Sequence, residues 1–252
     1  MNEGAAVVVV TGGGGGIGSA VAARMAADGR AVALADVNSE AAARTAESIT
    51  RSGGRATAYT LDIADPDQVQ LVVDRIVADL GRVDVLVNAA GIQFNCATVD
   101  LHPEDYLRVL GVNLNGVVYC CQAAGRHMIR LGGGVIISIS SVASSFGWPR
   151  RMPYAVTKAG VAALTRSLAV EWAPHNVRVV AIAPGFVDTA MDRYAFEQGH
   201  IRRDEVLGEI PQRRMAAPDE IAGLAAFLAS PEAAYITGQE IVADGGFSVL
   251  KL

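Results

Sequence analysis

The chain has 252 residues and a mass of 26.2 kDa, and its 21 basic and 26 acidic side chains give a formal charge of −5. Apolar residues make up 51% and charged residues 19%, a balance that supplies a sizeable core and excludes a disordered chain. A slightly acidic chain without a basic block argues against nucleic acid or an anionic membrane as a partner.

Targeting signals and cysteine usage indicate the compartment. No apolar run approaches the roughly 20 residues of a membrane helix, and the first residues lack the basic start and cleavage site of a signal peptide. The three cysteines, Cys96, Cys120 and Cys121, are odd in number and lack metal-ligand spacing. The four histidines are scattered. We therefore expect a cytoplasmic protein with free thiols and no metal site.

Short β-branched runs alternate with longer Ala- and Leu-rich segments along the whole chain. Strands are predicted at Ala5–Val10, Ala31–Ala35, Arg55–Thr60, Val83–Val87, Val135–Ile139, Val177–Ile182 and Glu240–Ala243. Helices are predicted at Ile17–Asp28, Ser39–Ser52, Pro66–Leu80, Pro103–Leu131, Tyr154–Ala173 and Pro218–Ala229. Several of the strands are continuously apolar, as strands buried on both faces of a parallel sheet are.

This alternation predicts a single α/β domain, residues 1–252, with a Rossmann-type doubly wound parallel sheet of about seven strands. No linker, repeat or charge block divides the chain. Ligands of such sheets bind beyond the carboxyl ends of the strands, close to the point where the strand order reverses. The residues that follow each strand are therefore the candidates for a functional site.

A run of five glycines follows the first predicted strand and opens the first predicted helix. Glycine lets backbone N–H groups approach a pyrophosphate, which the N-terminus of a helix also favours electrostatically. A flexible linker is the alternative, but the strand and the helix flank the run without a gap. The run fits three nucleotide-binding templates at once: GxGxxG with Gly13, Gly15 and Gly18, TGxxGxxG with Gly12, Gly15 and Gly18, and TGxxxGxG with Gly12, Gly16 and Gly18.

Asp36 ends the second predicted strand, 18 residues after Gly18. A carboxylate at this place accepts hydrogen bonds from the adenosine ribose of NAD and repels the 2′-phosphate of NADP. The residues at positions 15 and 37 are Gly15 and Val37, so neither supplies a compensating cation. Asp36 could also cap the next helix. The sequence favours NAD over NADP.

Tyr154 and Lys158 are spaced one turn apart on a predicted helix, so their side chains share one face. A positive charge beside a phenol stabilises the phenolate and lowers its pKa toward the range of a general acid or base. Ser141 follows the fifth strand, 13 residues before Tyr154. By itself the Tyr–Lys spacing is a weak signal, and its surroundings strengthen it.

Motifs along the whole chain together resemble the short-chain dehydrogenase/reductase family. That family has a TGxxxGxG turn, an NNAG-like turn, an Asn, a Ser, YxxxK and a Pro-Gly in this order. The counterparts here are Thr11–Gly18, Asn88–Gly91, Asn113, Ser141, Tyr154–Lys158 and Pro184–Gly185. The resemblance is to the short single-domain branch, since the enoyl-reductase branch spaces its Tyr and Lys further apart. One departure is Ala89, where the family usually has a second Asn.

The resemblance implies a role for each matching residue. Tyr154 would exchange a proton with the carbonyl or alcohol oxygen, and Lys158 would lower the pKa of that phenol and bind the nicotinamide ribose. Ser141 would hydrogen-bond the substrate oxygen, and Asn113 would hold a water in a proton relay behind Lys158. The implied cofactor-binding residues are Thr11, Gly12, Gly16, Ile17 and Gly18 at the pyrophosphate, Asp36 at the ribose, Asp62 and Ile63 at the adenine, Asn88 and Gly91 under the cofactor, and Pro184, Val187 and Thr189 at the carboxamide.

Each of these residues also has a simpler explanation. Ser141 could belong to a polar loop, Asn113 to a turn, and Asp62 could cap the helix that begins at Pro66. These explanations are improbable together, because the residues occur in the family's order and at the carboxyl ends of strands. The catalytic interpretation is therefore favoured for Tyr154, Lys158 and Ser141.

Substrate choice is expected to come from Ile92–Cys96, Val142–Pro153 and a lid at about residues 190–212. These stretches hold apolar and aromatic side chains: Phe94, Phe146, Trp148, Met152, Met191, Tyr194 and Phe196. An arginine among Arg150, Arg151, Arg202 and Arg203 could bind a substrate carboxylate or phosphate, although such arginines are more often solvated.

The leading prediction is an NAD(H)-dependent oxidoreductase that interconverts a secondary alcohol and a ketone. One alternative is an NADPH-dependent 3-oxoacyl carrier-protein reductase, against which Asp36 argues. Another is a catalytically idle nucleotide-binding regulatory protein, which would not need the set of Ser141, Tyr154 and Lys158. The family resemblance implies a homotetramer.

Overall fold

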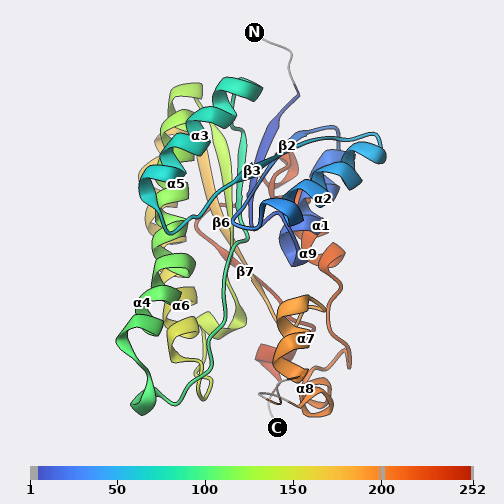
Figure 1. Cartoon of the computed structure of the whole chain (residues 1–252), viewed down its shortest axis with the longest axis vertical. Helices are drawn as coiled ribbons and strands as arrows, with labels where there is room; N and C mark the ends of the chain where they lie inside the picture. Colours follow the sequence, from blue (N-terminus) through green and yellow to red (C-terminus); the bar gives the residue numbers. More distant parts are fainter. Residues whose placement is uncertain (1–4, 198, 200–201, 251–252) are drawn as a thin grey trace.

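A sheet of parallel strands forms the centre of the molecule, with helices on both of its faces (Figure 1). The computed structural model describes residues 5–197, 199 and 202–250. The α/β fold with a Rossmann-type doubly wound sheet, in a single domain, is confirmed.

All pairings in the sheet are parallel, and the strand order is β3-β2-β1-β4-β5-β6-β7. The order reverses between β1 and β4, which places the switch point beside the glycine run. The strands are β1 (Val7–Thr11), β2 (Ala31–Asp36), β3 (Arg55–Thr60), β4 (Val85–Asn88), β5 (Gly134–Ile139), β6 (Val177–Pro184) and β7 (Glu240–Ala243). Each lies within two residues of its predicted bounds.

Helices α3 to α6 cover one face of the sheet, whereas α1, α2 and α9 cover the other (Figure 1). Helices α7 and α8 lie beyond the sheet, in the lower part of the view (Figure 1). The helices are α1 (Gly16–Ala27), α2 (Ser39–Arg51), α3 (Pro66–Leu80), α4 (Pro103–Leu110), α5 (Gly116–Leu131), α6 (Met152–Trp172), α7 (Ala190–Glu197), α8 (Arg203–Glu209) and α9 (Pro218–Leu228).

The strand β1 shows why the apolar runs become central strands. Val8 and Val10 pack into the core under α1 and α9, while Val7 and Val9 pack into the core under α3 and α5. Successive side chains of a strand point to opposite faces, so a strand between two helical layers has to be apolar at every position.

The helix predicted at Pro103–Leu131 is confirmed in its bounds, but it is not α-helical throughout. The structure has α4, then one π-helical turn at Gly111–Asn115, and then α5. Asn113 lies in that turn, and single π turns are frequent at functional sites. Because the apolar pattern continues through the turn, the sequence alone does not reveal the inserted residue.

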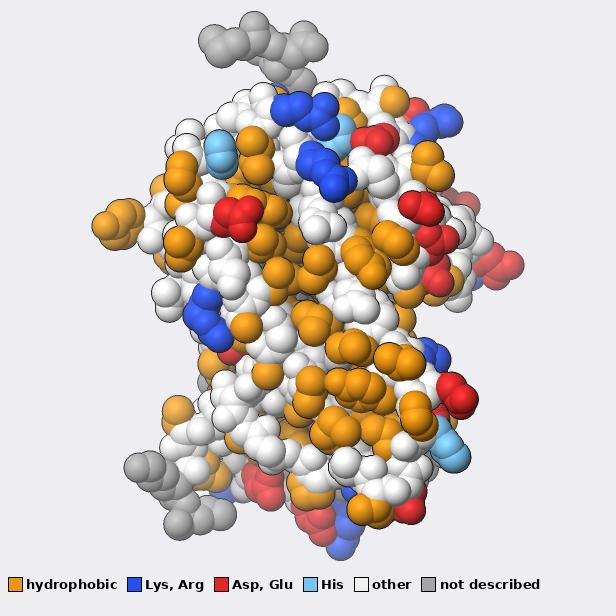
Figure 2. Space-filling view, turned by 90° about the vertical axis from the view of Figure 1, so that its left-hand side faces the viewer, with side chains coloured by type: hydrophobic (Ala, Val, Ile, Leu, Met, Phe, Trp, Pro, Cys, Tyr) orange, Lys and Arg blue, Asp and Glu red, His pale blue; other side chains and the backbone are white. Residues whose placement is uncertain are grey.

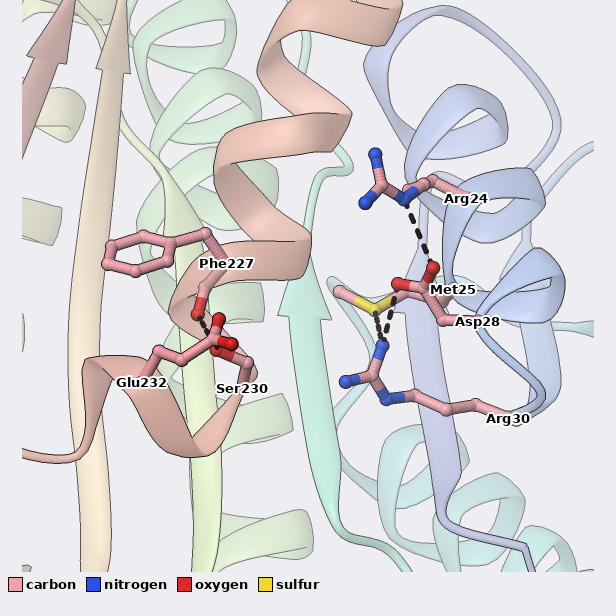
Figure 3. Close-up of polar contacts among 7 residues, drawn as sticks. All are labelled: Arg24, Met25, Asp28, Arg30, Phe227, Ser230 and Glu232. Atoms are coloured by element: carbon pink, nitrogen blue, oxygen red, sulfur yellow. Dashed lines mark hydrogen bonds and ion pairs between the residues drawn. The ribbon is translucent and has the colours of Figure 1, made fainter.

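Polar contacts close the ends of α1 and α9 at the amino ends of the strands (Figure 3). Asp28 accepts hydrogen bonds from Arg24 and Arg30, both at 3.2 Å. The Ser230 hydroxyl donates to the Phe227 carbonyl oxygen at 2.7 Å. A helix that follows a parallel strand runs back to the amino edge of the sheet, so these contacts lie away from the carboxyl edge where ligands bind.

Candidate active site

A cavity of about 440 Å³ opens at the carboxyl ends of the strands, where the strand order predicts a ligand site. It is lined by the loops that follow β1, β2, β3, β4, β5 and β6, and by the starts of α6 and α7. The predicted site residues that line it are Gly12, Gly16, Ile17, Asp36, Asp62, Ile63, Gly91, Ser141, Tyr154, Lys158, Pro184, Val187 and Thr189.

Thr11 and Gly18 were expected to bind the pyrophosphate, but they lie behind the cavity lining. The Thr11 hydroxyl accepts a hydrogen bond from the Ala90 N–H at 3.4 Å and is buried. A Cβ on Gly18 would lie 2.1 Å from the Gly12 carbonyl oxygen. Both residues therefore shape the turn between β1 and α1 from within the protein.

Asn88 and Asn113 are also buried behind the lining. Asn88 donates to the Ser138 hydroxyl at 3.2 Å, which links β4 to β5. The side-chain amide of Asn113 donates to the carbonyl oxygen of Ile92 and accepts from its N–H, both at 2.8 Å. Asn113 therefore holds the loop after β4 in place. Since its amide is occupied in this way, a relay through a water stays a prediction.

The glycine turn leaves the N-terminus of α1 uncovered on the side of the cavity. Gly15, the N-cap of α1, lines the cavity, has no neighbouring atom where a Cβ would lie and places no capping side chain over the helix N-terminus. Gly16 has φ +54°, a conformation that favours glycine. The first N–H groups of α1 are therefore open to a phosphate group at this end of the cavity.

Asp36 lines the cavity, while its neighbour Asn38 caps α2 by accepting from the Ala41 N–H at 3.0 Å. The Asp36 carboxylate accepts from the N–H groups of Gly14 and Asn38, both at 2.9 Å. These two bonds orient the carboxylate at the end of β2, and no described basic side chain forms an ion pair with it.

The helix cap that the sequence left open for Asp62 belongs to another residue. Asp65 accepts from the N–H groups of Asp67 and Gln68 at the start of α3. Asp62 lines the cavity and accepts from the Ala64 N–H at 2.9 Å. The carboxylate of Asp62 is therefore not used as a cap for α3.

Ser141, Tyr154 and Lys158 meet at one wall of the cavity. Ser141 follows β5, where its hydroxyl accepts from the Ala143 N–H at 3.2 Å. Tyr154 lies in the first turn of α6. Lys158 is 5% exposed, and its Nζ donates to the Ile139 carbonyl oxygen at 2.7 Å and lies 5.5 Å from the centre of the Tyr154 ring. The hydroxyl, phenol and ammonium groups are thus gathered at one place.

Burial dominates the protonation of this group of side chains. It raises the pKa of Tyr154, and the neighbouring Ser141 hydroxyl and the Arg151 charge lower that pKa in part. Burial also lowers the pKa of Lys158 from 10.5 to about 8. The sequence led us to expect Lys158 to lower the pKa of Tyr154, but burial has the largest effect on that pKa and raises it.

One end of the cavity holds two charged side chains, the buried Arg151 and the half-buried Asp192. Arg151 precedes α6, is 6% exposed, and donates from Nε to the Asn95 side-chain oxygen at 3.2 Å. Asp192 lies in α7 and accepts from the Val187 N–H at 3.2 Å. Of the four arginines weighed from the sequence, only Arg151 lines this cavity. Arg150, Arg202 and Arg203 are exposed.

Aromatic residues from distant segments pack beside this end of the cavity. Trp148 stacks on Phe247 with ring centres 5.9 Å apart, and its edge meets Phe186 at 5.4 Å. Of the apolar residues expected to contact substrate, Trp148 and Met191 line the cavity, whereas Phe146 and Phe196 pack within the aromatic group. Tyr194 is 60% exposed. The segment predicted as a lid comprises α7 and α8, and residues 198, 200 and 201 of it lie outside the described part.

Gln93 and Asp192 lie in stretches expected to choose the substrate, but sequence reasoning did not single them out as cavity residues. Burial raises the pKa of Asp192, while hydrogen bonds from Val187 and Gln93 and the Arg151 charge oppose that rise. The signal for Asp192 was its place just after Pro184–Thr189, but nothing local separates it from the other acidic residues of this segment. Among the described residues, no group of three or more His, Cys, Asp or Glu could hold a metal ion.

Comparison with known proteins gives the family. A family model described as "Enoyl-(Acyl carrier protein) reductase" matches residues 12–248. The D-threitol dehydrogenase of Mycolicibacterium smegmatis is 37% identical over 233 residues, which is 92% of this chain and 89% of that protein. The 3-oxoacyl-(acyl-carrier-protein) reductase FabG of Thermotoga maritima is 38% identical over 233 residues, 92% of this chain and 94% of that protein. The chain belongs to the short-chain dehydrogenase/reductase family.

A solved structure of the same family supports this assignment. The gluconate 5-dehydrogenase of Burkholderia cenocepacia, solved in complex with NADP and tartrate, superposes with a TM-score of 0.93. It is 35% identical, and the match covers 98% of this chain and 97% of that chain. The short-chain dehydrogenase/reductase described here is therefore an oxidoreductase of a family that binds a nicotinamide dinucleotide, and its general chemistry is the interconversion of alcohols and ketones.

Proposed function

We propose that the protein is an NAD(H)-dependent oxidoreductase that interconverts a secondary alcohol and a ketone. The observation that carries the proposal is the meeting of Ser141, Tyr154 and Lys158 in a cavity that also contains the glycine turn and Asp36. The spacing of Tyr154 and Lys158 favours a carbonyl over an enoyl substrate, because the enoyl-reductase branch spaces these residues further apart.

The side chains of this chain have the following roles in the proposal. When bound, the nicotinamide supplies or accepts the hydride. Tyr154 gives a proton to the carbonyl oxygen in reduction and takes it from the alcohol in oxidation. Ser141 donates a hydrogen bond to that oxygen, where negative charge develops. Lys158 holds the nicotinamide ribose, and α7 and α8 cover the substrate.

The preference for NAD rests on Asp36. Its carboxylate is held in place by two backbone N–H groups and lines the cavity at the end of β2. A fixed negative charge there suits two ribose hydroxyls and repels a 2′-phosphate. Some structural neighbours are NADP-bound, among them the gluconate 5-dehydrogenase, so the residue at this place is the proper test.

Replacing Asp36 by Ala is expected to weaken NADH binding about 10- to 100-fold, since a hydrogen bond to a charged group is worth about 1.5–3 kcal/mol. NADPH binding should strengthen, because the repulsion of the 2′-phosphate is removed. Fluorescence titration of both cofactors measures the two constants. Glu40→Gln is the matched control, because Glu40 is exposed, close in sequence and absent from the cavity lining.

A wild-type preference for NADPH would contradict the proposed cofactor. It would then favour the alternative function, an NADPH-dependent 3-oxoacyl carrier-protein reductase. A relative 38% identical is named as a 3-oxoacyl-(acyl-carrier-protein) reductase. An idle regulatory protein is disfavoured by the three gathered side chains. It would bind NADH but turn over none of a panel of ketones and secondary alcohols.

We also propose a homotetramer. Figure 2 shows apolar side chains gathered over the middle and lower parts of the face that α4, α5 and α6 form. The large apolar residues exposed on these helices are Leu107, Leu131, Val156 and Val170. Exposed apolar surface on several adjacent helices is typical of an interface between subunits. Light scattering during size-exclusion chromatography is expected to give a mass four times that of the chain. A mass equal to that of one chain would contradict the proposal.

Free thiols support a cytoplasmic location, which cell fractionation can check. Cys96, Cys120 and Cys121 form no disulfide. Burial raises the pKa of both Cys120 and Cys121, so neither thiol is reactive. Such cysteines suit a reducing compartment. No described helix is long and apolar enough to cross a bilayer.

A further inference from the structure

Arg151 is a buried cation whose hydrogen-bonding capacity is only partly used. Its Nη2 atom is buried and has no hydrogen-bond partner among the described residues. The side chain is 6% exposed and lines the cavity. Burying a charged donor without a partner is costly, so an Arg in this state needs a ligand or another function.

The neighbours of Arg151 hold it in position without satisfying its Nη2 atom. Nε donates to Asn95 at 3.2 Å, and the guanidinium carbon lies 4.7 Å from the centre of the Trp148 ring. The loop of Asn95 is itself fixed, because the Cys96 N–H donates to the Arg150 carbonyl oxygen at 2.9 Å. A guanidinium fixed through Nε and one face presents its remaining N–H groups in a defined direction, as anion recognition requires.

The remaining charged neighbour is Asp192, which belongs to the same end of the cavity. The two residues influence each other electrostatically, since each charge favours the ionised form of the other. They do not form an ion pair within 4.0 Å among the described residues. The Asp192 carboxylate instead accepts from the Val187 N–H. The partner that Arg151 lacks is therefore not supplied by Asp192.

We propose that Arg151 binds an anionic group of the substrate, and that the substrate is a small oxo acid or hydroxy acid with one carboxylate. This rests on the proposed function, whose substrate class it names. A single carboxylate suits one guanidinium, whereas a doubly charged phosphate would leave negative charge uncompensated next to Asp192. Arg151, the N-cap of α6, and Tyr154 in its first turn both line the cavity, so a small substrate that contacts both would carry its carboxylate a few bonds from the reacting carbon.

The test uses straight-chain oxo acids, with the carbonyl two, three or four carbons along the chain, and the methyl ester of each. Binding to the complex of protein and NAD⁺, which cannot reduce a ketone, is measured by calorimetry, and turnover with NADH by the loss of its absorbance. The wild-type protein is expected to bind at least one acid about 10- to 100-fold more tightly than its ester, because only the acid can form a charge-assisted hydrogen bond through a carboxylate.

Arg151→Gln is expected to remove this preference, because the binding of the acid weakens while the binding of the ester changes less than about twofold. Arg151→Lys retains the charge but loses the paired N–H donors of the guanidinium. Its preference for acid over ester should therefore lie between those of the wild-type protein and the Gln variant. Arg150→Gln is the matched control, because Arg150 is the adjacent arginine but is exposed and outside the cavity. Thermal unfolding shows whether each variant is folded, and the Lys variant keeps the test valid if the Gln variant is not.

Equal binding of every acid and its ester by the wild-type protein would overturn the proposal. So would an Arg151→Gln variant that weakens acids and esters alike, because Arg151 would then only position the loop. Tighter binding of a keto phosphate than of any oxo acid would overturn the choice of carboxylate. If NADH binds and no compound is turned over, the proposed function fails, while the binding preference still decides the role of Arg151.

Discussion

Tyr154→Phe is expected to lower kcat about 10²- to 10⁴-fold in both directions, the usual contribution of a positioned general acid or base. The change removes one hydroxyl group from a phenol that shares a wall of the cavity with Ser141 and Lys158. Binding of NADH should change less than about threefold, because the ring remains and the hydroxyl is assigned to the substrate oxygen. Steady-state assays with the preferred substrate measure kcat, and fluorescence titration measures the binding of NADH.

The pH dependence gives a second readout of the same residue. Oxidation needs the phenolate, and burial raises the pKa of Tyr154. In the wild-type protein kcat/KM for oxidation should therefore rise with pH into the alkaline range, whereas kcat/KM for reduction falls as the phenol loses its proton. This opposition should disappear in the Phe variant.

Tyr119→Phe is the matched control, because Tyr119 is a half-buried tyrosine of α5 outside the cavity. It should keep both rates and the pH profile. A Tyr154→Phe variant with wild-type turnover would show that another group exchanges the proton, and the proposed function would lose its general acid.

Lys158→Met is expected to lower kcat/KM about 10²- to 10³-fold, the typical loss when one positioned charged donor is removed from an active site. It should also weaken NADH binding, since the ammonium is assigned to the nicotinamide ribose. The reason to choose Met is its similar length and lack of charge. Steady-state kinetics and NADH titration measure these losses.

Stability should move in the opposite direction. Lys158 is 5% exposed and its pKa is lowered to about 8, so the folded protein carries the cost of a desolvated charge below that pH. The variant should therefore unfold at a higher temperature, by about 2–4 °C for each kcal/mol recovered in a domain of this size. From pH 8 to 10.5 the wild-type protein loses this cost, because the folded state releases its proton first, and the difference should narrow.

Thermal unfolding at several pH values checks this expectation. Gln70→Met serves as the control, because it places the same side chain on a helix away from the cavity. A Lys158→Met variant that is less stable than the wild-type protein at neutral pH would mean that the bond to the Ile139 carbonyl oxygen outweighs the cost of desolvation. A stable variant with full activity would remove Lys158 from the proposed site.

Patterns that are local in the sequence predicted the sheet and most of the site. The valine run of β1 can bury all of its side chains only between two helical layers, so its composition determined a central strand. The glycine turn and the pair of Tyr154 and Lys158 are each short enough for spacing to determine their geometry. Asp36 could be identified because it ends a strand at a known distance from the glycines.

Contacts between distant segments decided the rest. The π turn at Asn113 depends on Ile92, 21 residues away, which occupies both ends of its amide. No periodicity within one helix contains that information.

The choice among the arginines shows the same division most clearly. Arg150 and Arg151 are adjacent and chemically identical, so the sequence alone suggested an anion site but could not say which arginine forms it. The loop of Asn95 and the ring of Trp148 bury Arg151 and leave Arg150 exposed. The sequence therefore determined the sheet, the cofactor turn and the reacting side chains, because these depend on neighbours along the chain. The tertiary structure decided which charges are desolvated, because burial depends on neighbours in space.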